Sequence, residues 1–88
     1  MDYQQIRKEC AKKISACIGE RLSPEEVKIT YLMTWPSGDW RAFCTLEEDD
    51  ELAWEIATIG DSLFIWPFEK NSEAGEIVYI QIRAIEKR

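Results

Sequence analysis

Two alternating apolar segments on either side of a short turn constrain the fold of this chain more than any other feature. In residues 27–35 apolar and polar side chains alternate, which is typical of a strand with one buried face. The segment Pro36-Ser37-Gly38-Asp39 has the composition of a turn. Residues 40–46 have the character of a second strand. We therefore predict an antiparallel hairpin.

The length of the turn predicts how the two strands pair. Val27 and Ile29 would lie on the same face as the later apolar residues of the first strand. A four-residue turn brings the apolar faces of both strands together through three cross-strand pairs: Trp35 with Trp40, Met33 with Ala42, and Tyr31 with Cys44.

Residues 3–20 are predicted to form an amphipathic helix on the N-terminal side of this hairpin. Apolar side chains recur at helical spacing, while lysines lie off that stripe. Asp2 is expected to cap the start of the helix, and Gly19 lies where it should end. The following Ser23-Pro24-Glu25-Glu26 has the form of a capping box. Because β-branched and aromatic residues come next, we expect a single helical turn at 24–26.

The segment 50–59 fits two interpretations. As a helix it has one broad apolar arc, with Asp49 as N-cap and Gly60 after its last turn. As a strand it forms a hairpin with residues 63–68 through Gly60-Asp61, which is also a good turn. The helix is the preferred prediction, and the strand is the alternative.

The C-terminal third is predicted to add two strands. Residues 62–68 form an aromatic strand, in which Phe64, Trp66 and Phe68 share one side. A polar loop over 69–75 leads to a last strand over 76–85. We expect Tyr79 to face outward there, and the following residues to face inward: Val78, Ile80, Ile82 and Ala84.

The predicted fold class is α+β, with an N-terminal helix packed on an antiparallel sheet in a single domain, residues 1–88. The preferred element order is α-β-β-α-β-β. The alternative is one helix on a five-stranded antiparallel meander.

Charge and hydropathy limit the partners that we expect. The formal net charge is −6, and the acids lie mainly after residue 22, where fourteen face six basic residues. An acidic chain is repelled by phosphates, so we expect no direct nucleic-acid binding. No apolar run is long enough to span a bilayer or to act as a secretory signal. A cytoplasmic protein without membrane contact is the expectation.

No catalytic or metal-binding constellation is visible in the sequence. The chain has no histidine, which removes the commonest general base and metal ligand. Cys10, Cys17 and Cys44 are expected to be buried thiols, although a pairing of Cys44 with a helix cysteine stays open. We therefore expect no enzyme, cofactor or bound metal.

A four-residue block, Gly60-Asp61-Ser62-Leu63, resembles the signature of GDSL-type lipases and esterases. That family needs a histidine partner for its serine and a much larger α/β fold. The chain offers neither, so this block is interpreted as a turn between two elements.

The leading functional hypothesis is a small interaction module that binds a protein partner or a second copy of itself through exposed aromatic residues. Four Trp, three Tyr and three Phe are many for 88 residues. Tryptophan and arginine are common energetic centres of interfaces. The expected partner-binding residues are Trp35, Trp40, Arg41, Trp66 and Phe68.

Two other classes of function stay open. The acidic patch of Glu47, Glu48, Asp49, Asp50 and Glu51 suggests an inhibitor of the anti-defence type, which mimics phosphates in a basic nucleic-acid-binding site. A small-ligand binder, or an enzyme without a visible motif, is the third class.

Overall fold

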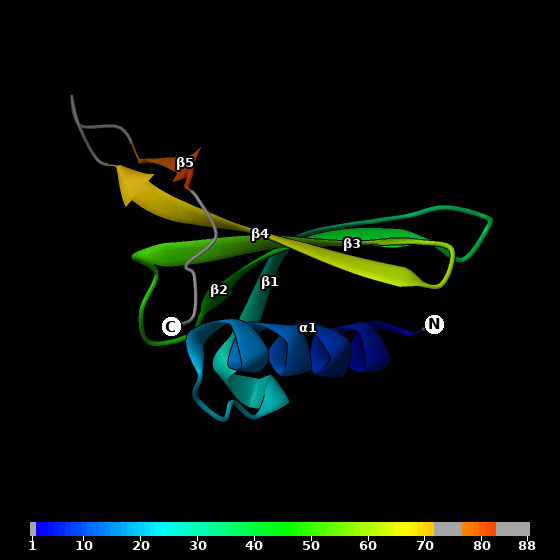
Figure 1. Ribbon diagram of the computed structural model, residues 1–88, viewed down its shortest axis with the longest axis horizontal. Helices are drawn as coiled ribbons and strands as arrows, with labels where there is room; N and C mark the ends of the chain where they lie inside the picture. The colour runs from blue at the N-terminus through cyan, green and yellow to red at the C-terminus, as the bar shows by residue number, and fades with distance from the viewer. Residues whose placement is uncertain (1, 72–76, 83–88) are drawn as a thin grey trace.

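The computed structural model describes residues 2–71 and 77–82, which form one helix packed on a five-stranded antiparallel sheet. Helix α1 (Tyr3–Ile18) and a short 3₁₀ turn, η1 (Pro24–Glu26), precede the sheet. The strands follow in chain order: β1 (Val27–Thr34), β2 (Trp40–Leu46), β3 (Leu52–Ile59), β4 (Ser62–Asn71) and β5 (Val78–Gln81). Each strand pairs with the next, so the sheet is a meander with β1 and β5 at its edges. Figure 1 shows α1 on one side of the twisted sheet.

The start of the chain folds as its local signals indicate. Asp2 caps α1, with its side chain accepting a hydrogen bond from the Gln5 amide at 2.8 Å, and Gly19 ends the helix in the left-handed region at φ 75°. The carboxylate of Glu26 accepts from the Ser23 amide at 2.8 Å, which fixes the single turn η1. The strand then begins at Val27, as predicted.

The hydrophobic core lies between α1 and the near face of the sheet. One stripe of the helix packs on the first three strands, and the buried members of this cluster are Ile6, Cys10, Ala11, Ile14, Val27, Trp40, Ala42, Cys44, Trp54 and Ile56. The side chain of Arg7 also links α1 to β1, because its Nε donates a hydrogen bond to the carbonyl of Val27 at 2.9 Å. The α+β class with an N-terminal helix on an antiparallel sheet is therefore confirmed.

The preferred element order was wrong within residues 50–59, because Leu52–Ile59 form strand β3 and not a helix. The alternative with five strands is the observed fold. Strand β3 is central and is covered on both faces. Ala53 and Trp54, then Ile56 and Ala57, are consequently buried as adjacent pairs. Because these two buried pairs begin three residues apart, the apolar residues follow the spacing of a helix. The alternation of apolar and polar residues that is typical of a strand is therefore missing from the sequence.

The predicted register of the first hairpin was also wrong. Trp40 pairs with Thr34 and Ala42 with Leu32, because the loop between the strands has five residues, 35–39, and not four. Cys44 pairs with Ile29, because the pairing shifts by one further residue between Ile29 and Tyr31. Thr30 is the extra residue of this β-bulge, and its hydroxyl donates to the carbonyl of Phe43 at 3.0 Å.

The bulge reverses the faces of the second half of β1. Leu32 packs against the core, whereas Tyr31 and Met33 are 52% and 39% exposed on the other face. Trp35 leaves the ladder and lies in the loop before β2, with its amide donating to the carbonyl of Asp39 at 2.9 Å. The single apolar face expected for residues 27–35 therefore ends at Ile29.

The last two strands differ from their predictions in length and facing. Strand β4 extends to Asn71, so residues 69–71 belong to the sheet and not to a loop. In β5 the inward and outward residues were exchanged: Val78 and Ile80 are exposed, and Tyr79 packs on Phe43. Ile82 lies after the strand and donates its amide to Pro67. The remainder of the predicted loop, and residues 83–88 with Ala84, lie outside the described residues.

Two isoleucines of β3 offer a test of where the core lies. Ile56 is completely buried, whereas Ile59 is 65% exposed. We expect Ile56→Ala to lower the free energy of unfolding by about 2–4 kcal/mol, and Ile59→Ala to change it by less than about 0.5 kcal/mol. Urea denaturation followed by tryptophan fluorescence measures both values. Equal losses would contradict the assignment of the core to the face that α1 covers.

Candidate functional site

The face of the sheet that points away from α1 carries most of the partly exposed aromatic residues. Cross-strand partners share a face, so the register identifies its members. We call this surface the open face, and it consists of Tyr31, Met33, Arg41, Phe43, Thr45, Ala53, Glu55, Ala57, Phe64, Trp66, Phe68, Lys70, Tyr79 and Gln81.

One half of the open face is a compact aromatic cluster. The rings of Phe43 and Phe68 lie 5.3 Å apart, and those of Phe43 and Tyr79 lie 5.5 Å apart, both edge to face. Phe43 and Tyr79 come from β2 and β5, so the sheet must curl for their rings to meet. Ala53 is completely buried, although α1 lies on the other side of the sheet. These aromatic side chains therefore serve the fold, and Phe68 is one of them.

The other half of the open face is more exposed. The rings of Phe64 and Trp66 are stacked at 6.1 Å, and Phe64 is 42% exposed. Arg41 lies across β3 from this pair, with its Nε 3.3 Å from Oε2 of Glu55. Both charged groups of this ion pair are partly exposed, so it contributes at most about 1 kcal/mol to stability. It orients the guanidinium along the surface.

A hollow of about 300 Å³ opens at this exposed end. It is lined by residues of three strands and the loop before β2: Trp35, Ser37, Asp39, Trp40, Arg41, Ala57, Thr58, Ile59 and Trp66. The carboxylate of Asp39 supports its rim, since one oxygen accepts from the Thr58 hydroxyl at 3.2 Å and from the Gly60 amide at 3.1 Å.

The structure brings four of the five predicted partner-binding residues together at this hollow. Trp35 is 43% exposed, Arg41 is exposed and Trp66 is half-buried. Trp40 also lines it but is only 2% exposed, because it belongs to the core under α1. Trp40 therefore offers almost no surface to a partner, although the sequence suggested it as an exposed partner-binding residue. Phe68 lies apart from the hollow, in the aromatic cluster.

Sequence reasoning missed three exposed apolar residues on or beside the open face. Tyr31 and Met33 were placed inside because the bulge at Thr30 has no sequence signature. Ile59 lies in the hollow, and its exposure follows from the strand at 52–59 that was the less favoured alternative. Phe64 was detectable, since it alternates with Trp66.

The acidic patch lies at the opposite end of β2 from the hollow. All five of its acids, Glu47, Glu48, Asp49, Asp50 and Glu51, are exposed. Four of them line a hollow of about 470 Å³ beside Phe43 and Tyr79, and Glu51 is the one that does not. Acidic residues therefore border the aromatic cluster.

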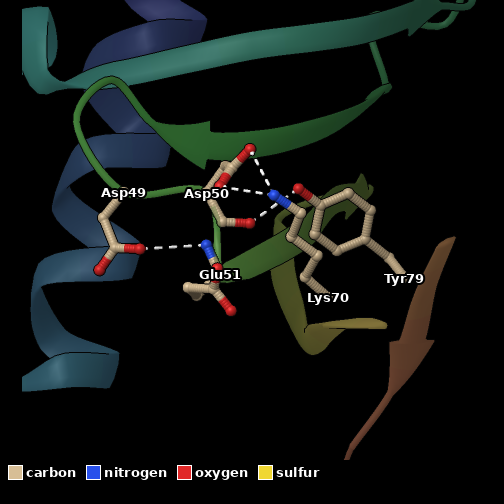
Figure 2. A network of polar contacts seen from close by, with 5 residues as sticks. All are labelled: Asp49, Asp50, Glu51, Lys70 and Tyr79. Carbon is tan, nitrogen blue, oxygen red and sulfur yellow. Dashed lines mark hydrogen bonds and ion pairs between the residues drawn. The ribbon is translucent and has the colours of Figure 1, made fainter. Parts of the chain in front are cut away.

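Three acids of this patch make contacts within the chain. Glu47 lies 3.9 Å from the Arg7 guanidinium, and Figure 2 shows the contacts of Asp49 and Asp50. Nζ of Lys70 lies 3.1 Å from both carboxylate oxygens of Asp50, and the Tyr79 hydroxyl donates to the Asp50 carbonyl at 2.8 Å. The carboxylate of Asp49 accepts from the Glu51 amide at 3.1 Å. These bonds tie the β2–β3 loop to β4 and β5.

The same contacts shift two titrating groups. The ion pair with Asp50 raises the pKa of Lys70 above 10.5. Burial, followed by the negative charge of Asp50, raises the pKa of Tyr79 above 10.0. Within residues 2–71 and 77–82, no group of three or more Cys, Asp or Glu side chains is arranged to hold a metal ion. In the same residues, α1 is too short and too polar to cross a bilayer.

Comparison with known proteins adds no relative: the chain matches no protein-family model, no curated protein and no solved structure. Its functional interpretation therefore depends on the geometry of the surface alone.

The network around Asp50 predicts a loss of stability at alkaline pH. Both pKa values are raised on folding, so the folded chain holds these two protons more tightly than the unfolded chain. The resulting stabilisation is present below about pH 10 and declines as the pH rises through the folded pKa values. The difference between the absorbance titrations at 295 nm of the unmodified chain and Tyr79→Phe isolates Tyr79, and its transition should lie above pH 10. A difference transition at or below pH 10 would contradict the assignment.

Proposed function

We propose that this chain is a small non-enzymatic protein-interaction module that binds its partner through the open face. One observation carries the proposal. Tyr31, Met33 and Phe64 are each more than a third exposed on a face that none of the described elements covers, and the hollow beside them adds Trp35 and Ile59. Exposed apolar patches of this kind are typical of interaction sites.

The arrangement of this surface fits protein recognition. Trp35, Trp40 and Trp66 line a concave site at the exposed end of this face, together with Arg41. Interfaces concentrate their binding energy in tryptophan, tyrosine and arginine held in such pockets. Since β3 and β4 hold Trp66 and its neighbours in a regular ladder, the site loses little conformational freedom on binding.

Charge favours a basic partner protein over a second copy of the chain. The net charge is −6, so two copies would bring like charges together. The exposed carboxylates of Glu47, Glu48 and Asp49 lie at one end of the open face. We therefore propose that the partner presents an apolar patch flanked by lysine or arginine, and that the chain does not bind nucleic acid directly. A cytoplasmic setting is part of the proposal, supported by the three free cysteines.

The hollow beside Trp35 supports a second candidate, a small-ligand binder. Its volume of about 300 Å³ lies at the lower end of the range for ligand pockets, and aromatic side chains line it. A thermal-shift screen with nucleotides, metals and metabolites separates the two. A hit that raises the Tm in the absence of any protein partner would favour this candidate.

The acidic inhibitor receives less support from the contacts. Asp50 is neutralised by Lys70, Asp49 caps a backbone amide, and Glu47 pairs with the Arg7 guanidinium, so three of the five acids are engaged within the chain. The acidic patch is better suited to steering a basic partner toward the open face.

Substitution on the open face tests the proposal. In a pull-down from lysate of the source organism, we expect Trp66→Ala and Phe64→Ala to weaken binding of the captured protein at least tenfold, because each removes an aromatic contact at the centre of the exposed half. Tyr3→Ala is the matched control, since Tyr3 is 45% exposed on α1, away from the open face. Far-UV circular dichroism checks that each variant folds. Full binding by both open-face variants would contradict the proposal.

Salt dependence tests the contribution of the acidic patch. For the captured partner, raising the salt concentration from 50 to 500 mM should lower the association rate, as should Glu48→Lys. Glu25→Lys, at an exposed acid in η1, should have a smaller effect. An association rate that neither salt nor Glu48→Lys changes would argue against a basic partner. If the chain is recovered alone, sedimentation equilibrium will show whether it binds a second copy.

A further inference from the structure

Two cysteines from distant parts of the sequence meet in the core between α1 and the sheet. Cys10 lies in the middle of α1 and Cys44 in β2, and both side chains are completely buried in the same cluster. The Cys44 thiol lies close enough to Cys10 to raise the pKa of the Cys10 thiol. Cys17 is only half-buried and lies seven residues beyond Cys10, about 10 Å farther along the helix axis.

We propose that Cys10 and Cys44 form an oxidant-sensitive dithiol, which a small disulfide such as oxidised glutathione converts into a cross-link between α1 and β2. Such a bond requires that the two residues lie close together and that their side chains point toward one another. Both side chains point into the core between α1 and the sheet. Both residues belong to regular elements that already pack together, so the bond joins parts that are neighbours in the native state. Cys17 has no place in this cross-link.

The reaction proceeds by two thiol–disulfide exchanges. The thiolate of one cysteine attacks the disulfide of glutathione, which gives a mixed disulfide and releases one molecule of glutathione. The thiolate of the other cysteine then displaces the second glutathione. The chain loses two protons and two electrons, and the oxidant is reduced to two thiols.

The native packing controls when this reaction occurs. The hydrogen bond with Cys44, followed by burial, raises the pKa of Cys10 far above its usual range, so this thiol stays protonated in the folded protein. Both thiols are also completely buried and therefore out of reach of an oxidant. An oxidant can reach them only when α1 lifts from the sheet. In a reducing compartment both cysteines stay reduced. Under oxidising conditions the disulfide forms and holds α1 against the sheet.

The cross-link should leave the open face unchanged. Cys44 pairs with Ile29 and Trp54 on the face that α1 covers, opposite to the neighbouring Phe43. Oxidation therefore stabilises the scaffold without altering the proposed binding surface. It closes a loop between positions 34 residues apart, and we expect the Tm to rise by on the order of 10 °C.

Oxidation of the purified chain with oxidised glutathione tests the proposal. Intact mass should fall by two hydrogens, the count of free thiols should fall from three to one, and peptide mapping should join Cys10 to Cys44. The variant Cys17→Ala should behave in the same way, whereas Cys44→Ala should not form the link. Dithiothreitol should reverse the changes in mass and Tm.

Several results would overturn the proposal. These are a link that includes Cys17, mixed disulfides with glutathione as the final product, three free thiols after oxidation in mild urea, or a cross-linked chain with a lower Tm. Should Cys44→Ala fail to fold, mapping of Cys17→Ala decides alone.

A pair of variants at one exposed position of α1 tests whether opening of this helix controls the rate of oxidation. Lys12→Gly weakens the helix where Lys12→Ala does not, so the glycine variant should oxidise about fivefold faster than the alanine variant. Equal oxidation rates would overturn the role of helix opening. Binding through the open face should be the same before and after oxidation. The test of the cross-link itself does not depend on this binding measurement.

Discussion

The contact between the apolar stripe of α1 and the middle of the sheet is the interaction on which the rest of the molecule depends. A meander of this size has two faces, and one helix can cover only one of them. Ile6, Cys10 and Ile14 of α1 are buried against that face, together with Ala42 and Ile56. The remaining aromatic residues must therefore lie on the other face. Some cover the small side chains of β3, and the others stay in contact with solvent.

Much of the fold was predictable because local signals agree with the final packing. Asp2 marks the start of α1 and Gly19 marks its end, and the turn before Trp40 marks the first hairpin. The bulge at Thr30 was not predictable, because one extra residue changes the facing of all later residues of β1 without altering its composition. Strand β3 was misread because both of its faces are buried, so that its pattern of apolar residues matches a helix as well as a strand.

The candidate site was predictable in part for the same reason. Composition identified the tryptophans, and the spacing of β4 placed its aromatic side chains on one face. Whether a given tryptophan meets solvent depends on which face α1 covers, which is a tertiary property. Trp40 and Trp66 look equivalent in the sequence, yet Trp40 is buried in the core under α1, whereas Trp66 is only half-buried on the open face. The contact between Cys10 and Cys44 also requires the tertiary arrangement, since 34 positions separate them.

The bulge in β1 has a consequence for behaviour at high concentration. Strand β1 is at the edge of the sheet and carries unpaired backbone groups along one side, which makes it a template for another chain. A regular strand of eight residues would offer an uninterrupted row of such groups. The bulge interrupts that row near the middle and twists the strand. The bulge at Thr30, which turns Tyr31 toward the open face, thus also protects this edge against repeated pairing with strands of other chains and against fibril growth.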